Sequence, residues 1–341
     1  MSVILEGLEH RLQDISKVPL CDLGLKLGRP EAKGIHVPAD FQQADIDKYI
    51  HKAFQNNAAE YVKSHQNLPY HEQIVTYILK KSHFKYNSQD RFLCLDLCSG
   101  AGNSVIPLLN LYPKSEVIAS DLSIELLCIL KGELDSRALR ERCALLQLNA
   151  EDLSFKDNTI DVIIACAALH HLIEPMKSLE GAARILKKNG LAIFVEPFES
   201  GYALLEMIWK GILDDPRAVN DVQQEVKTWF RFLITDWPAR KGSHAKCGEK
   251  YDNMEDKWLF SRAFFEDAVE SSGFTRCQIL PLNVNSSPFV ERTNAYLMAW
   301  PYGPCLTLPD WAWASVRRHE DNFSMDTRKE FLFECAVVLT K

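Results

Sequence analysis

The sequence predicts an α/β protein built on a mostly parallel sheet of seven strands, with helices on both faces. Two observations lead to this fold class. From residue 92 onward, short apolar runs alternate with segments of helical periodicity, which is the pattern of strands joined by right-handed helical crossovers. The first run leads directly into an acidic residue and a Gly-x-Gly turn. A strand followed by such a turn is typical of a loop that binds a nucleotide.

Each apolar run is expected to form one strand, with a helix after most of them. The expected strands are 92–97, 116–120, 144–148, 160–165, 191–196, 275–282 and 331–339, and the expected helices of this part are 104–112, 124–139, 174–188, 202–213 and 261–272. The helix 174–188 should have Pro175 in its first turn, Lys187 and Lys188 in its last turn, and Gly190 as its stop. Before residue 92, helical periodicity appears in 4–15 and in 45–81, where Pro69 divides two helices.

Composition excludes several classes of protein. Of the 341 residues 47% are hydrophobic, but no apolar stretch approaches the roughly 20 residues of a membrane span. The acidic N-terminus does not resemble a secretory signal, so a cytoplasmic location is expected. The net charge is −7, and basic residues occur in runs no longer than pairs. This balance counts against a nucleic-acid partner without excluding a local basic patch.

The ten cysteines are scattered, and no Cys-x-x-Cys or His-x-x-x-His pattern is present. Several of them lie inside apolar runs, where cysteine behaves as a small buried hydrophobe in a reducing compartment. We therefore expect no metal site.

The candidate binding residues follow the first two strands of the main pattern. Asp96 lies at the end of the first strand, Gly100 and Gly102 form the turn, and Asp121 ends the second strand, 19 residues after Gly102. Ligands of an open α/β sheet lie across the carboxyl ends of the strands, and an acid at the end of the second strand can accept hydrogen bonds from both ribose hydroxyls. The spacing therefore indicates a cofactor that contains a nucleoside.

Dinucleotides and nucleoside triphosphates fit this loop poorly. A dinucleotide loop has a third glycine where this chain has Val105, and a pyrophosphate would lie close to the carboxylate of Asp96. No Gly-Lys-Ser/Thr follows the turn, which excludes a Walker loop. A cofactor with a ribose, no phosphate and an ammonium group near an acid is S-adenosylmethionine.

At this point the chain resembles a known family. The run Leu-Asp-Leu-Cys-Ser-Gly-Ala-Gly-Asn at 95–103 resembles motif I of the class I S-adenosylmethionine-dependent methyltransferases, which have a Rossmann-like fold. Further motifs follow in the family's order at 119–123, 148–155, 169–172 and 186–190. The resemblance covers 91–199 and is looser over 259–282 and 331–341. Relatives of the ubiquinone-biosynthesis type also carry cysteine at the position of Cys98, whereas Asn149 and Ser154 depart from the commoner Asp and Pro.

The resemblance implies a role for each matching residue of the cofactor loop. The methionine end of the cofactor would be held by Asp96, the Gly100–Gly102 backbone and the Cys166 backbone, the ribose by Asp121, and the adenine by Leu122, Asn149 and Ala150. Catalytic candidates are His171, slightly ahead of His170, and Glu196. Each of these side chains could serve as a base. Shaping the pocket, for the histidines, and a structural hydrogen bond, for Glu196, stay open as alternatives.

The domain organisation follows from the same match. Residues 1–90 are expected to form a helical lead-in or cap, 91–199 with 259–282 and 330–341 the methyltransferase core, and 200–258 with 283–329 two insertions that cap the acceptor site. The implied reaction is methyl transfer to O, N or C of a small, partly apolar metabolite. A methyltransferase acting on tRNA or protein, and a catalytically inactive cofactor-binding partner protein, are the alternatives. The sequence carries no indication of the oligomeric state.

Overall fold

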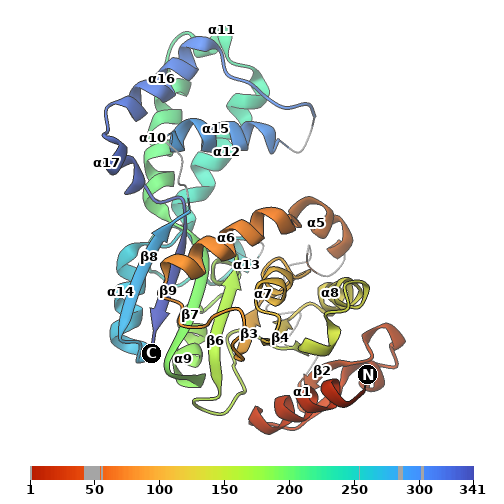
Figure 1. Cartoon of the computed structure of the whole chain (residues 1–341). Helices are drawn as coiled ribbons and strands as arrows, with labels where there is room; N and C mark the ends of the chain where they lie inside the picture. Colours follow the sequence, from red (N-terminus) through yellow and green to blue (C-terminus); the bar gives the residue numbers. More distant parts are fainter. Residues whose placement is uncertain (1, 42–53, 55–56, 253, 283–286, 301–302) are drawn as a thin grey trace.

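The computed structural model describes residues 2–41, 54, 57–252, 254–282, 287–300 and 303–341 (Figure 1). The strands of these residues form one sheet in the order β1-β2-β5-β4-β3-β6-β7-β9-β8. They are β1 (Leu20–Asp22), β2 (Ile35–Pro38), β3 (Leu93–Leu97), β4 (Glu116–Asp121), β5 (Cys143–Gln147), β6 (Ile160–Cys166), β7 (Leu186–Pro197), β8 (Arg276–Pro281) and β9 (Glu334–Thr340). Strands β2 to β7 run parallel, and β9 is antiparallel to both of its neighbours.

The predicted fold class is confirmed, with nine strands where the sequence predicts seven. The two additional strands come from residues 1–40. β2 pairs in parallel with β5, through Ile35 opposite Leu145, and β1 pairs with β2. Strands of three and four residues between glycines and prolines are too short to show alternating hydrophobicity, so the sequence pattern does not reveal them.

Helices cover both faces of the sheet. On one face lie α6 (Leu68–Lys81), α7 (Val105–Leu111) and α8 (Ile124–Ser136), and on the other α1 (Ser2–Ile15), α9 (Pro175–Ile185) and α14 (Arg262–Ser272). Neighbouring strand residues alternate between the two cores: Phe194 packs with α9 and α14, whereas Ile193 packs on the α6–α8 face. Shorter helices are α2 (Leu23–Leu27), α5 (Ala58–His65) and α13 (Glu249–Asp252).

The predicted helical stretch 45–81 falls partly outside the described residues. Within them it forms the two helices α5 and α6, as the sequence predicts, and Pro69 lies in the first turn of α6.

The predicted end of the helix 174–188 is wrong. Helix α9 ends at Ile185, and Leu186 already pairs with Ile160 as the first residue of β7. Lys187 therefore belongs to a strand, and its Nζ forms an ion pair with Asp161 at 2.8 Å. Gly190 is required by close packing, because a Cβ there would lie 2.8 Å from the carbonyl oxygen of Lys187.

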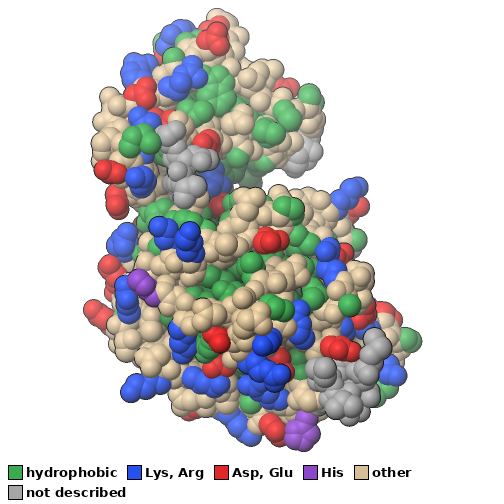
Figure 2. Space-filling view, in the orientation of Figure 1, with side chains coloured by type: hydrophobic (Ala, Val, Ile, Leu, Met, Phe, Trp, Pro, Cys, Tyr) green, Lys and Arg blue, Asp and Glu red, His purple; other side chains and the backbone are tan. Residues whose placement is uncertain are grey.

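The two insertions pack together into one helical module. It consists of α10 (Glu199–Asp214), α11 (Ala218–Asp221), α12 (Gln224–Arg240), α15 (Pro288–Met298), α16 (Asp310–Asp321) and α17 (Met325–Lys329). Trp209 stacks on Phe230 at 4.0 Å between ring centroids, and its Nε1 donates to Thr293 Oγ1 of the second insertion at 3.1 Å. Figure 2 shows the module as a separate lobe joined to the sheet layers by a narrower waist. Among the described residues, no helix is both long and apolar enough to cross a membrane.

Candidate active site

The turn after β3 has the backbone geometry of a ligand-binding loop. Cys98, Gly100 and Gly102 have positive φ values of 53°, 50° and 93°. This conformation favours glycine, which explains why glycine is commoner in the family at the position of Cys98. A Cβ on Gly102 would lie 2.6 Å from a methyl carbon of Leu130, whereas a Cβ on Gly100 would meet nothing within 4 Å. Gly100 therefore borders open space.

Asp96 is a fully buried carboxylate beneath this turn. Its exposure is 0%, and neither carboxylate oxygen has a hydrogen-bond partner of normal geometry. Burial raises the pKa of Asp96 to about 8; the nearby Ser104 hydroxyl opposes this shift, and the charge of Asp121 adds to it. An unpaired buried carboxylate is costly, so this site fits a ligand that brings a cation.

Asp121 is held at the end of β4 by the backbone. Its two oxygens accept hydrogen bonds from the N–H groups of Gly100 and Ser123, each at 2.8 Å. Burial raises the pKa of Asp121 to about 6, against the lowering effect of these bonds. Ser123 itself caps α8 by accepting from Leu126 N–H at 3.2 Å. The carboxylate is therefore fixed beside the glycine turn.

A cavity of about 100 Å³ lies over the ends of β3, β4 and β5, and we call it the cofactor cavity. It is lined by Phe54, Tyr61, Cys98, Gly100, Asp121, Leu122, Leu126, Leu148, Asn149, Ala150, Glu151, His171 and Leu172. Five of the predicted cofactor residues thus meet here. Asp96 and Gly102 do not line this cavity, and Cys166 lines a neighbouring one.

Two cofactor-cavity residues, Phe54 and Tyr61, were missed because they lie before the recognised motifs. The two rings meet edge to face at 5.0 Å. Helical periodicity predicts the helix α5 that carries Tyr61, but periodicity says nothing about which side chains cover a ligand site.

His170 and Glu196 form a buried pair at the ends of β6 and β7. The Glu196 carboxylate accepts from the N–H groups of Ala168, Leu169 and His170 and approaches His170 Nδ1 at 2.6 Å. Burial lowers the pKa of His170, but the charge of Glu196 and its hydrogen bond outweigh burial, so the pKa is raised above its ordinary value. Glu196 is 1% exposed, and its bonds fix the orientation of the imidazole.

His171 faces the cofactor cavity. Its Nδ1 donates to the carbonyl oxygen of Glu255 at 2.9 Å, and its ring packs edge to face against Phe54 at 5.2 Å. Burial and the neighbouring His170 lower the pKa of His171 to about 3, so the ring is neutral.

Asp256 lies beside both histidines. Its Oδ1 is 3.5 Å from His170 Nε2, and its Oδ2 accepts from Arg240 at 2.8 Å. Burial raises the pKa of Asp256, but His170, His171 and Arg240 outweigh burial and hold it below its usual range. The side chains of His170, His171 and Asp256 lie close enough together to hold a metal ion. However, the Asp256 carboxylate already forms an ion pair with Arg240, and the His171 ring already donates to the carbonyl oxygen of Glu255. These contacts favour a hydrogen-bonded network over a metal site.

A larger cavity of about 410 Å³ lies between the strand ends, α6 and the helical module, and we call it the acceptor cavity. It is lined by Tyr70, His71, Ile74, Cys166, Ala167, His170, Val195, Glu196, Pro197, Tyr202, Asp256, Arg292, Ala295, Tyr296, Ala299 and Glu334. Arg292 forms an ion pair with Glu334 at 2.8 Å, while His71 Nδ1 is buried without a partner. No motif marks these residues of α6, α10 and α15 in the sequence, because folding alone brings them together.

The fold, the positive-φ turn after β3 and the acids Asp96 and Asp121 fit a ligand that combines a nucleoside with a cationic group. A methyltransferase domain occupies residues 95–194 of this chain. Its site fits S-adenosylmethionine as the cofactor.

Comparison with known proteins gives the same family. A model described as "Methyltransferase domain" matches residues 95–194. A demethylmenaquinone methyltransferase of Lactiplantibacillus plantarum is 30% identical over 34% of this chain and 49% of its own length. One of Staphylococcus carnosus is 28% identical over 66% of this chain and 88% of its own length. This chain thus spans only about half of the first of these relatives.

Among solved structures, a geranyl diphosphate C-methyltransferase of Streptomyces coelicolor A3(2), in complex with S-adenosyl-L-homocysteine, is also similar. Its TM-score is 0.46 at 11% identity, with 79% of this chain and 75% of that chain covered.

Because Asp96 is buried and unpaired, ligand binding is expected to release a proton from its carboxyl group. With a pKa of about 8 the free carboxyl is mostly protonated near pH 7, and a bound ammonium favours its ionised form. Binding of S-adenosylhomocysteine is therefore expected to release close to one proton at about pH 7. Calorimetry in phosphate and Tris buffers measures this number.

The Asp96→Asn variant should show no release, and the exposed Asp135→Asn should behave as the wild type. Equal binding enthalpies in the two buffers for the wild type would contradict this assignment of Asp96.

Proposed function

We propose that the chain transfers the methyl group of S-adenosylmethionine to O, N or C of a small, partly apolar metabolite bound in the acceptor cavity. The observation that carries the proposal is that two adjacent residues line two different cavities at the strand ends. His171 faces one of them and His170 the other. A cofactor held by Asp121 in the first cavity, with its ammonium at Asp96, would have its methyl group beside Cys166 and Ala167, where the second cavity begins.

Methyl transfer is an in-line displacement in which an acceptor lone pair forms the new bond to carbon and the sulfonium becomes a neutral thioether. The leaving group needs no acid, so alignment and exclusion of water can supply most of the acceleration, up to roughly 7–11 kcal/mol. An acceptor hydroxyl, amine or acidic carbon must still lose a proton. We assign its removal to His170, with Glu196 as the positioning residue, and not to His171, whose ring faces the cofactor cavity.

The helical module is proposed to act as the acceptor-site cap. It supplies Tyr202, Arg292 and Tyr296 to the cavity, and α6 supplies Tyr70 and Ile74 from the opposite side. Aromatic rings and alanines suit a flat, apolar acceptor. Two relatives are named as demethylmenaquinone methyltransferases, which supports an acceptor with an apolar ring. The cytoplasmic location stays a prediction.

Labelled cofactor tests the proposal directly. The full chain is incubated with S-adenosylmethionine that carries a ¹³C-methyl group and with fractionated cell metabolites, and products are identified by their mass shift. We expect a labelled small molecule whose formation falls when the module residue Tyr296 is replaced by Trp, which narrows the cavity. Label that appears only in tRNA or protein, with activity that falls steeply as salt is added, would contradict the proposal.

A further inference from the structure

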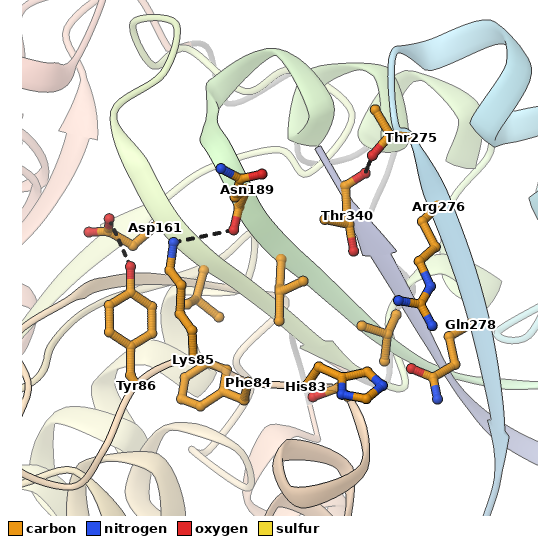
Figure 3. A pocket seen from close by; sticks show the side chains of 14 residues that line it. His83, Phe84, Lys85, Tyr86, Asp161, Asn189, Thr275, Arg276, Gln278 and Thr340 are labelled. Atoms are coloured by element: carbon orange, nitrogen blue, oxygen red, sulfur yellow. Dashed lines mark hydrogen bonds between the residues drawn. The ribbon is translucent and has the colours of Figure 1, made fainter.

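A separate cavity lies at the other end of the parallel strands (Figure 3). Its volume is about 290 Å³, at the lower end of the ~300–1,000 Å³ of small-molecule pockets. It is lined by Ser82, His83, Phe84, Lys85, Tyr86, Asp161, Val162, Asn189, Leu191, Thr275, Arg276, Gln278, Val338 and Thr340. Asp161 lies near the start of β6 and Cys166 at its end, about 16 Å along the strand. This cavity is therefore distinct from the candidate active site.

The floor of the cavity is one face of the sheet. Val162 is the partner of Leu191, Leu191 of Thr340, and Thr340 of Arg276, so these four residues form one row across β6, β7, β9 and β8. Partners in such a row project to the same face. Helix α6 ends at Lys81, and the turn that follows borders this part of the sheet instead of a helix. On this floor Leu191 is therefore partly exposed, whereas Val162 is 2% exposed and already covered.

The walls of the cavity carry surplus positive charge. Asp161 is the lining carboxylate, and it already accepts from Lys187 Nζ at 2.8 Å, Leu93 N–H at 3.0 Å and the Tyr86 hydroxyl at 3.3 Å. Lys85 Nζ donates to the carbonyl oxygen of Asn189 at 3.3 Å and forms no ion pair with a described residue.

Arg276 forms no ion pair within the described part of the chain either, and its guanidinium lies beside Gln278 and His83 in Figure 3. His83 follows the C-cap Ser82 of α6 and has a φ of 55°, the left-handed conformation in which helices commonly end. The lining thus carries two cations, Lys85 and Arg276, against the one carboxylate of Asp161, in a chain of net charge −7.

We propose that this cavity, which we call the anion cavity, binds a small molecule with a phosphate or carboxylate group. The anionic group lies between Arg276 and Lys85, and a compact apolar part covers Leu191. The enclosed size and the apolar floor favour a small molecule over a nucleic-acid backbone. The site is independent of the methyl-transfer proposal, because it shares no lining residue with the cofactor and acceptor cavities.

Phenyl phosphate is the probe, since it combines an anionic group with a flat apolar ring. It is titrated by calorimetry into the full chain saturated with S-adenosylhomocysteine, with ionic strength held constant by KCl. Saturable binding is expected for the wild type. Arg276→Gln and Lys85→Gln should each weaken it roughly tenfold to hundredfold, as expected for loss of a charge-assisted hydrogen bond. Arg231→Gln, an exposed site on the helical module, should leave the affinity unchanged.

Two further measurements make the outcome unambiguous. The affinity for S-adenosylhomocysteine should be the same in all variants, which shows that they are folded. Inorganic phosphate should bind more weakly than phenyl phosphate, because it leaves the apolar floor uncovered. Absence of saturable binding to the wild type, or equal affinity of wild type and both cavity variants, overturns the proposal. Equal affinity for the two probes overturns the placement of an apolar group on the sheet.

Discussion

Replacing His170 by Gln is expected to lower kcat by roughly 10²–10⁴-fold while cofactor affinity stays the same. The side chain lines the acceptor cavity, and its Nδ1 is bound to Glu196 at 2.6 Å, which leaves Nε2, 3.5 Å from Asp256 Oδ1, as the atom able to accept a proton. Glutamine has similar bulk but cannot serve as a base. The measurement is steady-state turnover of the product identified with labelled cofactor, with cofactor affinity from calorimetry.

The pH dependence gives a second readout of the same assignment. Glu196 raises the pKa of His170, so the imidazolium persists to higher pH than in an ordinary histidine, with its pKa of about 6.5. Because the base must be neutral, kcat should rise with pH through this raised pKa. Removing the negative charge in Glu196→Gln lowers the pKa of His170, and the rising limb should move to lower pH.

A matched control separates this role from general destabilisation. His10 is exposed on α1, far along the chain from both cavities, and His10→Gln should leave kcat and its pH profile unchanged. Undiminished turnover in His170→Gln would exclude His170 as the base. A pH profile that does not move in Glu196→Gln would exclude Glu196 as its positioning residue and leave it only a structural hydrogen bond.

The cofactor loop could be predicted because its information is local. Each of its elements is a short run in which strand, turn and acid follow one another, and five of the predicted residues line one cavity. Parallel strands end at one edge of the sheet, so residues at successive strand ends meet without any knowledge of side-chain packing.

The acceptor side could not be predicted in the same way. Arg292, Tyr296 and Tyr202 come from two insertions that pack on each other, and no local pattern encodes that contact. The sequence also did not show which of His170 and His171 lines the acceptor cavity. These adjacent residues of the short turn after β6 line different cavities. Which cavity each one lines depends on its long-range hydrogen bond, to Glu196 for His170 and to Glu255 for His171.

Strand and helix ends depended on tertiary contacts too. The end of α9 was misplaced because Lys187 suits a helix terminus, yet pairing of Leu186 with Ile160 draws it into β7. The short strands β1 and β2 exist only because β5 offers an edge for pairing.

Replacing Asp121 by Ala is expected to weaken the binding of S-adenosylhomocysteine by about one to three orders of magnitude. Loss of the acceptor for buried ribose hydroxyls costs roughly 1–3 kcal/mol for each hydroxyl left unpaired. The carboxylate also holds the N–H groups of Gly100 and Ser123, so its loss loosens the turn that cradles the ligand. Asp135→Ala, at an exposed position of α8, is the matched control.

The 2′-deoxy analogue of S-adenosylhomocysteine distinguishes the two contributions. If Asp121 binds the ribose, the wild type should bind the analogue much more weakly than S-adenosylhomocysteine, whereas Asp121→Ala should bind the two ligands almost equally. The difference between the two proteins is the coupling energy between the Asp121 side chain and the hydroxyl. If Asp121 only supports the turn, both proteins should lose the same affinity on removal of the hydroxyl. Because burial raises the pKa of Asp121 to about 6, wild-type affinity should also fall as the carboxyl is protonated below that pH, and Asp121→Ala should lack this dependence.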